Sequence, residues 1–330
     1  MSQDVKDPMT SENSKIKYFP INIFAIVMGL AGFTLATYST ISIKELNLTL
    51  AIITTVVFII FTILYAIKLV KYPGAVKEES NHPVKISFFP AFSICLLLLS
   101  SVWGDYSFGK YIWYAGCTLQ LFLTLFVLYS LLNKTFNINH INPAWFIPVA
   151  GPLIIPMAGI KLDSVFISLL AFPIGLIFWI MLFTILLYRL IFHDPLPPKL
   201  IPMLCIMLAP PSIAAVSYLH IDAYFTKGLI GSPTALMFYG VALFIFLFLL
   251  CNIKKFIKAP FFLSAWAYSF PIAAFIIATS KIVPSYTTSE FVTSVNAIIL
   301  ALYGLFALLI LYLVVRTINL ALKNKICVAE

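Results

Sequence analysis

The chain has 330 residues, of which 62% are hydrophobic and 10% are charged, and its formal net charge is +9 at pH 7. Soluble domains carry about 25% charged residues, so this composition excludes a soluble globular protein. The charges lie in short clusters, and the apolar runs between them are long enough to cross a bilayer as helices. The sequence therefore predicts an all-α polytopic protein embedded in the lipid bilayer.

The apolar runs form a series of ten segments that follow a polar start. Residues 1–19 are expected to form a polar cytoplasmic tail, residues 20–318 a ten-helix transmembrane channel domain, and residues 319–330 a cytoplasmic C-terminal tail. Because the connections are short, neighbouring segments should pair as five helical hairpins. The expected segments are 20–40, 48–70, 86–103, 109–132, 143–160, 164–188, 201–220, 231–252, 260–281 and 291–316.

The basic residues are distributed unevenly between the two sides of this topology. Of the 21 Lys and Arg residues, 16 fall in the two tails and in the loops that lead into odd-numbered segments, and five fall on the other side. The positive-inside rule then predicts cytoplasmic N- and C-termini, and we expect a bacterial inner membrane. Basic inner loops account for the net charge, so no nucleic acid partner is expected.

Proline marks the beginning of each odd-numbered segment. These prolines recur every 54 to 70 residues, and they are Pro20, Pro90, Pro148, Pro202 and Pro260. A fixed element at such a period indicates a repeated unit. Simple helix starts explain the five prolines equally well, because the missing N–H of proline needs no partner in the first turn.

Interior prolines are harder to explain as helix starts. The odd-numbered segments contain Pro152, Pro156, Pro210, Pro211 and Pro271. Membrane helices tolerate such breaks where protein or a cavity covers the freed carbonyls. We therefore expect an inner ring of five bent odd helices around a central pore, and an outer ring of even helices. The expected kinks that line the pore are Pro20, Pro90, Pro148, Pro152, Pro210 and Pro271, and Pro173 departs from the pattern because it lies in an even segment.

No ionisable residue falls in the middle of an apolar segment. Intramembrane enzymes and most proton-coupled carriers need such groups, whereas a passive pore does not. The sequence therefore predicts no catalytic residue, no metal site and no cofactor. Lys68, Arg189 and Arg316 lie at cytoplasmic segment ends, where long side chains are expected to reach water.

One face of the ninth segment carries Trp266, Phe270 and Ala274 at intervals of four residues. If this face lines the pore, Phe270 is a bulky plug and Pro271 sets the bend that directs it. The chain has 30 phenylalanines, and on these residues alone ordinary packing is the stronger interpretation of Phe270.

The opening FPINIFAIVMGLAGF, the proline-marked odd segments and above all AWAYSFPIAAFIIAT resemble the tellurite-resistance/dicarboxylate transporter family over residues 18 to 316. That family includes TehA-like bacterial proteins and the slow-type anion channel of plant guard cells. The resemblance implies a homotrimer with one pore in each subunit. It also implies selectivity for anions and occlusion of the pore by a phenylalanine of the ninth helix, which by position is Phe270.

Two functions remain open at this point. The first is a gated channel for small inorganic or organic anions. The second is a secondary carrier that exports C4-dicarboxylates such as malate, or tellurite. A carrier of the second kind would need a titratable or cationic group in the path. The absence of such a group at mid-membrane favours the channel.

Overall fold

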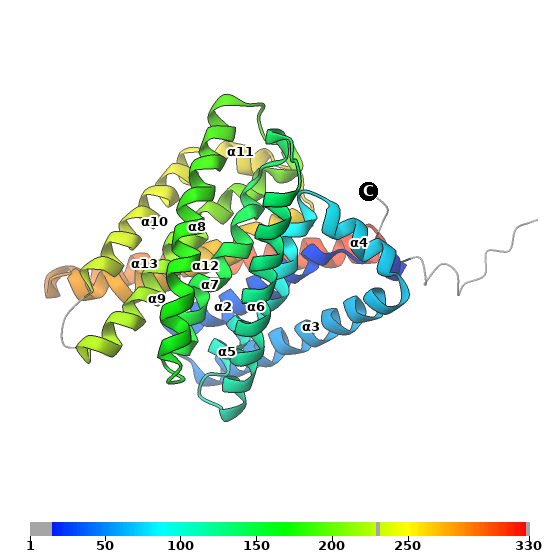
Figure 1. Ribbon diagram of the computed structural model, residues 1–330. Helices are drawn as coiled ribbons and strands as arrows, with labels where there is room; N and C mark the ends of the chain where they lie inside the picture. Colours follow the sequence, from blue (N-terminus) through cyan, green and yellow to red (C-terminus); the bar gives the residue numbers. More distant parts are fainter. Residues whose placement is uncertain (1–14, 229–231, 328–330) are drawn as a thin grey trace, which may run out of the picture.

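The computed structural model describes residues 15–228 and 232–327, and within these ranges every regular element is a helix (Figure 1). Nine of the described helices are long and apolar enough to cross a membrane, and Pro143–Gly159 is a shorter apolar helix. The prediction of an all-α polytopic membrane protein is confirmed. Most of the expected N-terminal tail lies outside the described residues.

The helices include short 3-10 helices, written η, as well as α-helices. In chain order they are η1 (Ile21–Ile23), α2 (Phe24–Thr40), α3 (Lys44–Lys71), α4 (Pro73–Asn81), η2 (Lys85–Phe88), α5 (Phe89–Val102), α6 (Ser107–Asn133), η3 (Ile138–His140), η4 (Pro143–Phe146), α7 (Ile147–Gly159), α8 (Val165–Phe192), η5 (Pro198–Leu208), α9 (Ala209–Thr226), α10 (Pro233–Cys251), α11 (Ile253–Lys258), η6 (Leu263–Tyr268), α12 (Ser269–Ile282), η7 (Val283–Tyr286) and α13 (Ser289–Leu322).

Every odd-numbered segment begins as a 3-10 helix and continues as an α-helix, in the pairs η1–α2, η2–α5, η4–α7, η5–α9 and η6–α12. In the last four pairs a proline is the second or third residue of the α-helix: Pro90, Pro148, Pro210 and Pro271. Proline is inexpensive there because its missing N–H is not needed in the first turn. The repeated units therefore align at the junction between each 3-10 helix and the α-helix that follows it. Pro202, inside η5, and Pro260, ahead of η6, are not the equivalent prolines of their units.

The shortest apolar segment, η4 with α7, still reaches across most of a bilayer. A 3-10 helix rises about 2.0 Å per residue and an α-helix about 1.5 Å, so this segment spans about 28 Å against a hydrocarbon core of about 30 Å. Its sequence is rich in Gly and Pro, and every residue of α7 except Met157 is buried. It is therefore the most enclosed of the inner helices.

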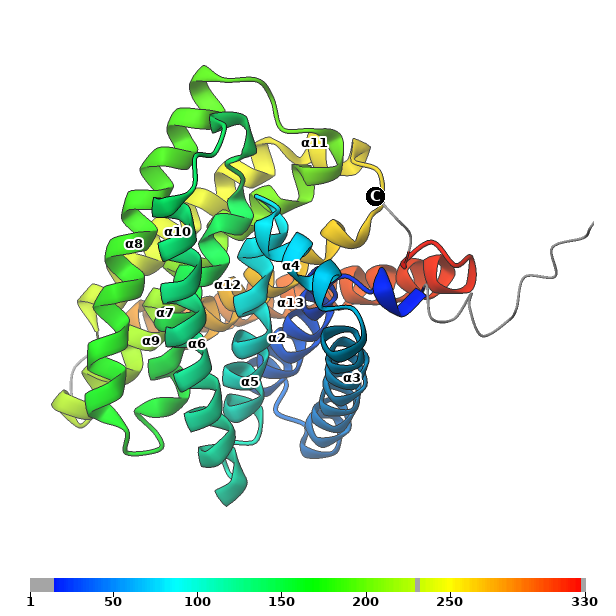
Figure 2. The ribbon, with the colours of Figure 1, turned by 45° about the vertical axis from the view of Figure 1, so that its right-hand side comes forward.

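The five odd-numbered α-helices form a closed ring. Contacts run from α2 to α5, α7, α9 and α12 and back to α2, and each following helix packs on its predecessor: α3 on α2, α6 on α5, α8 on α7, α10 on α9 and α13 on α12. In Figure 2, α2, α7 and α12 lie in the middle of the molecule, and α3 and α8 lie at its edges.

Burial separates the two rings. In an 18-residue apolar window of each long odd-numbered span 67 to 83% of the residues are buried, against 17 to 33% in such windows of the even-numbered spans. The even helix α8, which contains Pro173, belongs to the outer group, with 33% of its window buried. The exposed residues of the outer helices are mostly large and apolar, as a lipid-facing surface requires.

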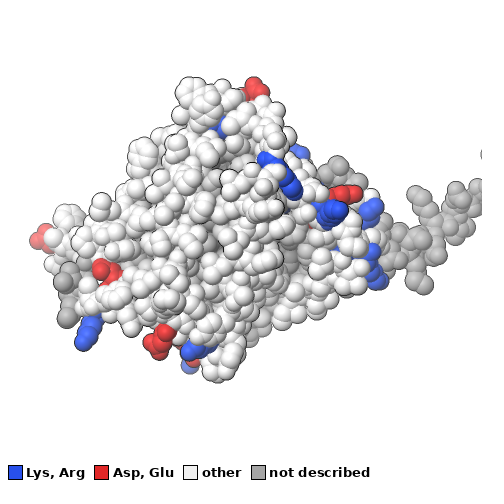
Figure 3. Space-filling view, in the orientation of Figure 1, with Lys and Arg blue, Asp and Glu red and all other residues white. Residues whose placement is uncertain are grey.

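Charged side chains gather at the ends of the helices and leave the broad middle surface uncharged (Figure 3). The two ends of the described chain lie together, because Lys15 Nζ donates a hydrogen bond to Asn324 Oδ1 at 3.0 Å. Both ends are therefore on one side of the molecule.

The amphipathic helix α4 was not expected from the sequence, and it holds a buried ion pair. Lys68 Nζ lies 2.9 Å from Glu79 Oε2 and donates to the Phe19 carbonyl at 2.8 Å. Glu79 also accepts hydrogen bonds from the Tyr65 hydroxyl at 2.9 Å and from the Ile21 N–H at 3.3 Å. This cluster ties α3 and α4 to the beginning of the first span.

Two of the three basic side chains expected to reach water do not. Lys68 is 2% exposed and Arg189 is 1% exposed, whereas Arg316 is exposed and lies over the Phe261 ring at 5.1 Å. For Lys68 the reason is the carboxylate that α4 brings to it. No pattern in the flanking sequence pointed to that contact.

We predict that Glu79→Ala destabilises the protein by about 3–5 kcal/mol, because it leaves Lys68 charged and buried without a partner. Thermal unfolding of the purified protein in detergent measures the effect. The matched control is Glu78→Ala, which removes an exposed carboxylate from the same helix and should change stability by less than about 0.5 kcal/mol. Equal effects of the two variants would contradict the assigned role of the pair.

Candidate functional site

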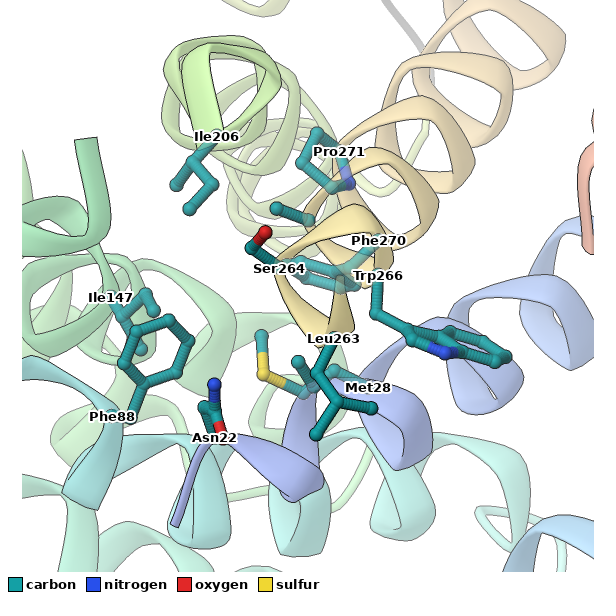
Figure 4. Close-up of a pocket in the computed structure, with 12 residues that line it drawn as sticks. Asn22, Met28, Phe88, Ile147, Ile206, Leu263, Ser264, Trp266, Phe270 and Pro271 are labelled. Atoms are coloured by element: carbon teal, nitrogen blue, oxygen red, sulfur yellow. The ribbon is translucent and has the colours of Figure 1, made fainter. Parts of the chain in front are cut away.

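Two hollows lie along the axis of the helix ring. The near hollow, of about 40 Å³, lies on the side where the five inner segments begin. Each segment contributes to its wall, including Met28, Phe88, Ile147, Ile206 and Phe270 (Figure 4). A water molecule needs about 10–15 Å³ by this measure, so the near hollow has room for a few waters.

The far hollow, of about 10 Å³, lies further along the same helices. Leu35, Leu98, Met157, Val216 and Ala274 line it, one from each inner helix. Early residues of all five segments meet at the near hollow and later residues meet at the far hollow. The five inner helices therefore run in the same direction around a common axis.

Among the described residues, Phe270 is the one that lines both hollows. Its side chain is 7% exposed, and it forms part of the wall of each hollow. It is the second residue of α12, directly after the 3-10 turn of η6.

Glycine on the neighbouring helix α2 lets α12 approach closely beside Phe270. A Cβ atom added at Gly32 of α2 would lie 2.9 Å from the Ala273 Cβ and 3.4 Å from Phe270 Cδ2. Small residues at a helix contact allow such close backbone approach in a membrane. The position of Phe270 therefore depends on α2 as well as on its own helix.

Trp266 and Ala274 differ in their relation to the axis. Ala274 lines the far hollow. Trp266 borders the near hollow, but its indole Nε1 donates to Thr317 Oγ1 of α13 at 2.8 Å. In Figure 4 the indole is directed away from Ile206 and Ile147 on the opposite wall. Trp266 therefore connects η6 to the outer helix α13.

One of the six prolines predicted to line a pore borders a hollow. Pro271 borders the near hollow, and the other five border neither hollow: Pro20, Pro90, Pro148, Pro152 and Pro210. Pro152 cannot donate to the Pro148 carbonyl, as the residue four positions later normally does. That carbonyl instead accepts hydrogen bonds from Gln120 Nε2 at 3.1 Å and Thr124 Oγ1 at 2.7 Å, both from the outer helix α6.

Asn22 is a wall residue that the sequence analysis missed. It borders the near hollow, and its side-chain oxygen is buried without a hydrogen-bond partner in the described structure. The sequence feature that could have pointed to it is the amide side chain of Asn22 itself, within the apolar run that opens the first span. Otherwise the walls are almost entirely apolar, and no ionisable side chain of the described residues borders either hollow. Such walls can select by size and by the cost of dehydration.

Comparison with known proteins assigns the family. Residues 18–318 match the family model described as voltage-dependent anion channel (SLAC1). The chain is 28% identical over 292 residues to the uncharacterized transporter MJ0762 of Methanocaldococcus jannaschii, a match that covers 81% of this chain and 85% of that relative.

Two further relatives carry names that describe a function. The S-type anion channel SLAH2 of Arabidopsis thaliana is 30% identical, over 80% of this chain and 52% of the relative. The tellurite resistance protein TehA homolog of Haemophilus influenzae is 25% identical, over 77% of this chain and 78% of the relative. The family resemblance predicted from the ninth segment is thus confirmed, and its members transport anions rather than catalyse reactions. The chain belongs to the voltage-dependent anion channel family and is a multi-pass membrane protein of anion transport.

Proposed function

We propose that the protein is an anion-selective channel in which each chain encloses one permeation path, closed by the Phe270 ring. The observation that carries this proposal is that Phe270 alone borders both axial hollows. The path needs no partner chain for its walls, because all five inner helices come from one chain.

The direction of the inner helices favours anions over cations. All five begin on the side of the near hollow, so the positive ends of their dipoles lie on that side. The basic residues of the cytoplasmic loops add positive potential at the same mouth. Small inorganic or organic anions are the proposed substrates, with dicarboxylates or tellurite-type oxyanions as further ones.

A secondary carrier for C4-dicarboxylates such as malate, or for tellurite, is the alternative. The words transporter and tellurite resistance in the names of two relatives favour it. The lack of an ionisable group on the walls of the hollows disfavours a proton-coupled carrier.

We also propose a homotrimer in a bacterial inner membrane, with both termini in the cytoplasm. The 16-to-five distribution of basic residues and the shared side of the two chain ends support this orientation. The proposed tails are residues 1–19 and 319–330, on either side of the channel domain 20–318. Helix α13 continues to Leu322, so it would project beyond the domain.

We predict that Phe270→Ala opens the path. Removal of the ring should raise passive anion flux into liposomes by about tenfold or more, since a barrier lowered by about 1.4 kcal/mol gives that factor. The measurement compares chloride, nitrate, malate and potassium under an imposed voltage. Saturable malate uptake without chloride current would favour the carrier.

Phe275→Ala is the matched control for this variant. Phe275 lies on the same helix and is buried, but its ring stacks on Phe246 and Tyr239 of the outer helix α10. Its loss should cost about 3–5 kcal/mol of stability without raising flux. If Phe270→Ala conducts no better than wild type or than Phe275→Ala, the Phe270 side chain only packs in the protein core. The proposal that it closes the path is then wrong.

We predict a mass of three chains for the purified protein, measured by light scattering with the detergent contribution subtracted. Each subunit should conduct separately, because each chain closes its own ring. A single-chain mass in several mild detergents would contradict the homotrimer but would leave the path within one chain untouched.

A further inference from the structure

Three basic side chains lie one helical turn beyond the far hollow. They are Lys161, His220 and Lys281, and they follow the hollow-lining residues Met157, Val216 and Ile277 by four positions each. Residues four apart lie on the same face of a helix. The faces of α7, α9 and α12 that border the far hollow therefore continue into this basic cluster.

The helical geometry extends as far as Lys161. Although α7 ends at Gly159, the Leu162 N–H still bonds the Ala158 carbonyl at 3.0 Å, so the backbone turns once more. Lys161 is exposed, whereas His220 and Lys281 are half-buried. The cluster thus extends from the far end of the axis to the surface, where a solute could reach it.

His220 and Lys281 are in direct contact. The Lys281 Nζ atom lies 3.5 Å from His220 Nε2, and an ammonium can only donate, so Nε2 of a neutral ring accepts. Nδ1 then carries the ring hydrogen. It is buried and has no hydrogen-bond partner among the described residues. The contact with Lys281 is therefore the polar contact that the ring makes.

Neither lysine of this cluster has a carboxylate within salt-bridge distance among the described residues. The salt bridge that the described residues form joins Lys68 to Glu79, beside Phe19. The charged group that acts on Lys281 is Lys161, another cation. Like charges that converge in a partly buried place are unfavourable unless an anion binds between them.

We infer that Lys161 and Lys281 form a binding site for a small anion at the far mouth of the path, with His220 as a positioning residue that holds the Lys281 ammonium. The ligand class is a single small negative group, such as chloride, nitrate or one carboxylate. Lys281 has two further N–H donors besides the one that contacts His220, and the Lys161 ammonium has three. This inference deepens the proposed function and rests on it for its place on the path.

The far-mouth site gives the path a charge filter that its apolar walls lack. Two cations beside a narrow entrance raise the local concentration of anions and repel cations. Conduction also requires that binding be weak enough for release. A site at the mouth, where Lys161 is exposed, meets that requirement better than one in the buried middle.

The experiment measures anion binding without transport. Purified protein in a neutral detergent is titrated with sodium chloride or sodium nitrate against sodium gluconate at constant ionic strength, and its melting temperature is followed. Wild type should show a saturable rise on the order of 2–4 °C. Lys281→Gln and Lys161→Gln should each weaken the apparent affinity by about tenfold or more.

The control is Lys227→Gln, which removes another exposed lysine near the far end of α9 and should keep the wild-type titration. An unchanged titration in Lys161→Gln, or the absence of any saturable rise in wild type, would overturn the site. Because Lys161 is exposed, Lys161→Gln should fold, and its titration tests the anion site even if Lys281→Gln does not fold.

The role of His220 is tested with a conservative pair. His220→Gln keeps an amide oxygen that can accept from Lys281, whereas His220→Leu does not. We expect the Gln variant to retain anion affinity and the Leu variant to lose it. Equal affinity in both would contradict the positioning role.

A transport measurement separates this inference from the proposed function. In the Phe270→Ala background, Lys281→Gln should reduce the ratio of chloride to potassium permeability. If Phe270→Ala does not conduct but the binding titrations behave as expected, the proposed gate is rejected and the proposed anion site is supported. If Phe270→Ala conducts and the lysine variants have wild-type anion affinity and ion selectivity, the anion site is rejected and the gate is supported.

Discussion

A backbone carbonyl without a hydrogen-bond partner costs several kcal/mol inside a bilayer, and this constraint shapes the whole ring. Prolines in the interior of an inner helix remove N–H donors, so a carbonyl one turn earlier needs a donor from elsewhere. The Pro148 carbonyl shows the solution, since Gln120 and Thr124 of α6 donate to it. The outer helices therefore do more than shield the ring from lipid. They permit the proline-rich inner helices to exist at all.

Close approach between helices is the second requirement, and it depends on residues without bulk. Gly151 makes room for the Gln120 amide, and Gly32 makes room for α12 beside Phe270. The close approach at Gly32 also fixes the place of Phe270 beside the two hollows. In the proposed channel, the contacts that support the wall would therefore also hold the obstruction to the path.

The sequence was sufficient for the features that depend on composition and period. Long uncharged runs predicted the membrane helices, and the recurrence of proline predicted which helices are buried. The sequence analysis took Pro202 and Pro260 as the repeated prolines of their segments, because the apolar residues of those segments begin there. The structure aligns the repeated units at the junction of the 3-10 helix and the α-helix, further along the chain. The Lys68–Glu79 pair and the role of Gln120 depend on contacts between distant segments. No local pattern encodes such contacts.

In the proposed channel, the position of the charges relative to Phe270 would explain how an apolar path can distinguish anions from cations. A charge inside a narrow hydrophobic passage would hold its ion too tightly, and an unpaired lysine there would be costly to bury. A charge at the mouth acts before the ion is dehydrated, where binding remains reversible. Among the described residues no ionisable side chain borders either hollow, and Lys161 and Lys281 follow one turn beyond the far one. Selection by charge and obstruction by Phe270 can then be separate steps along one axis.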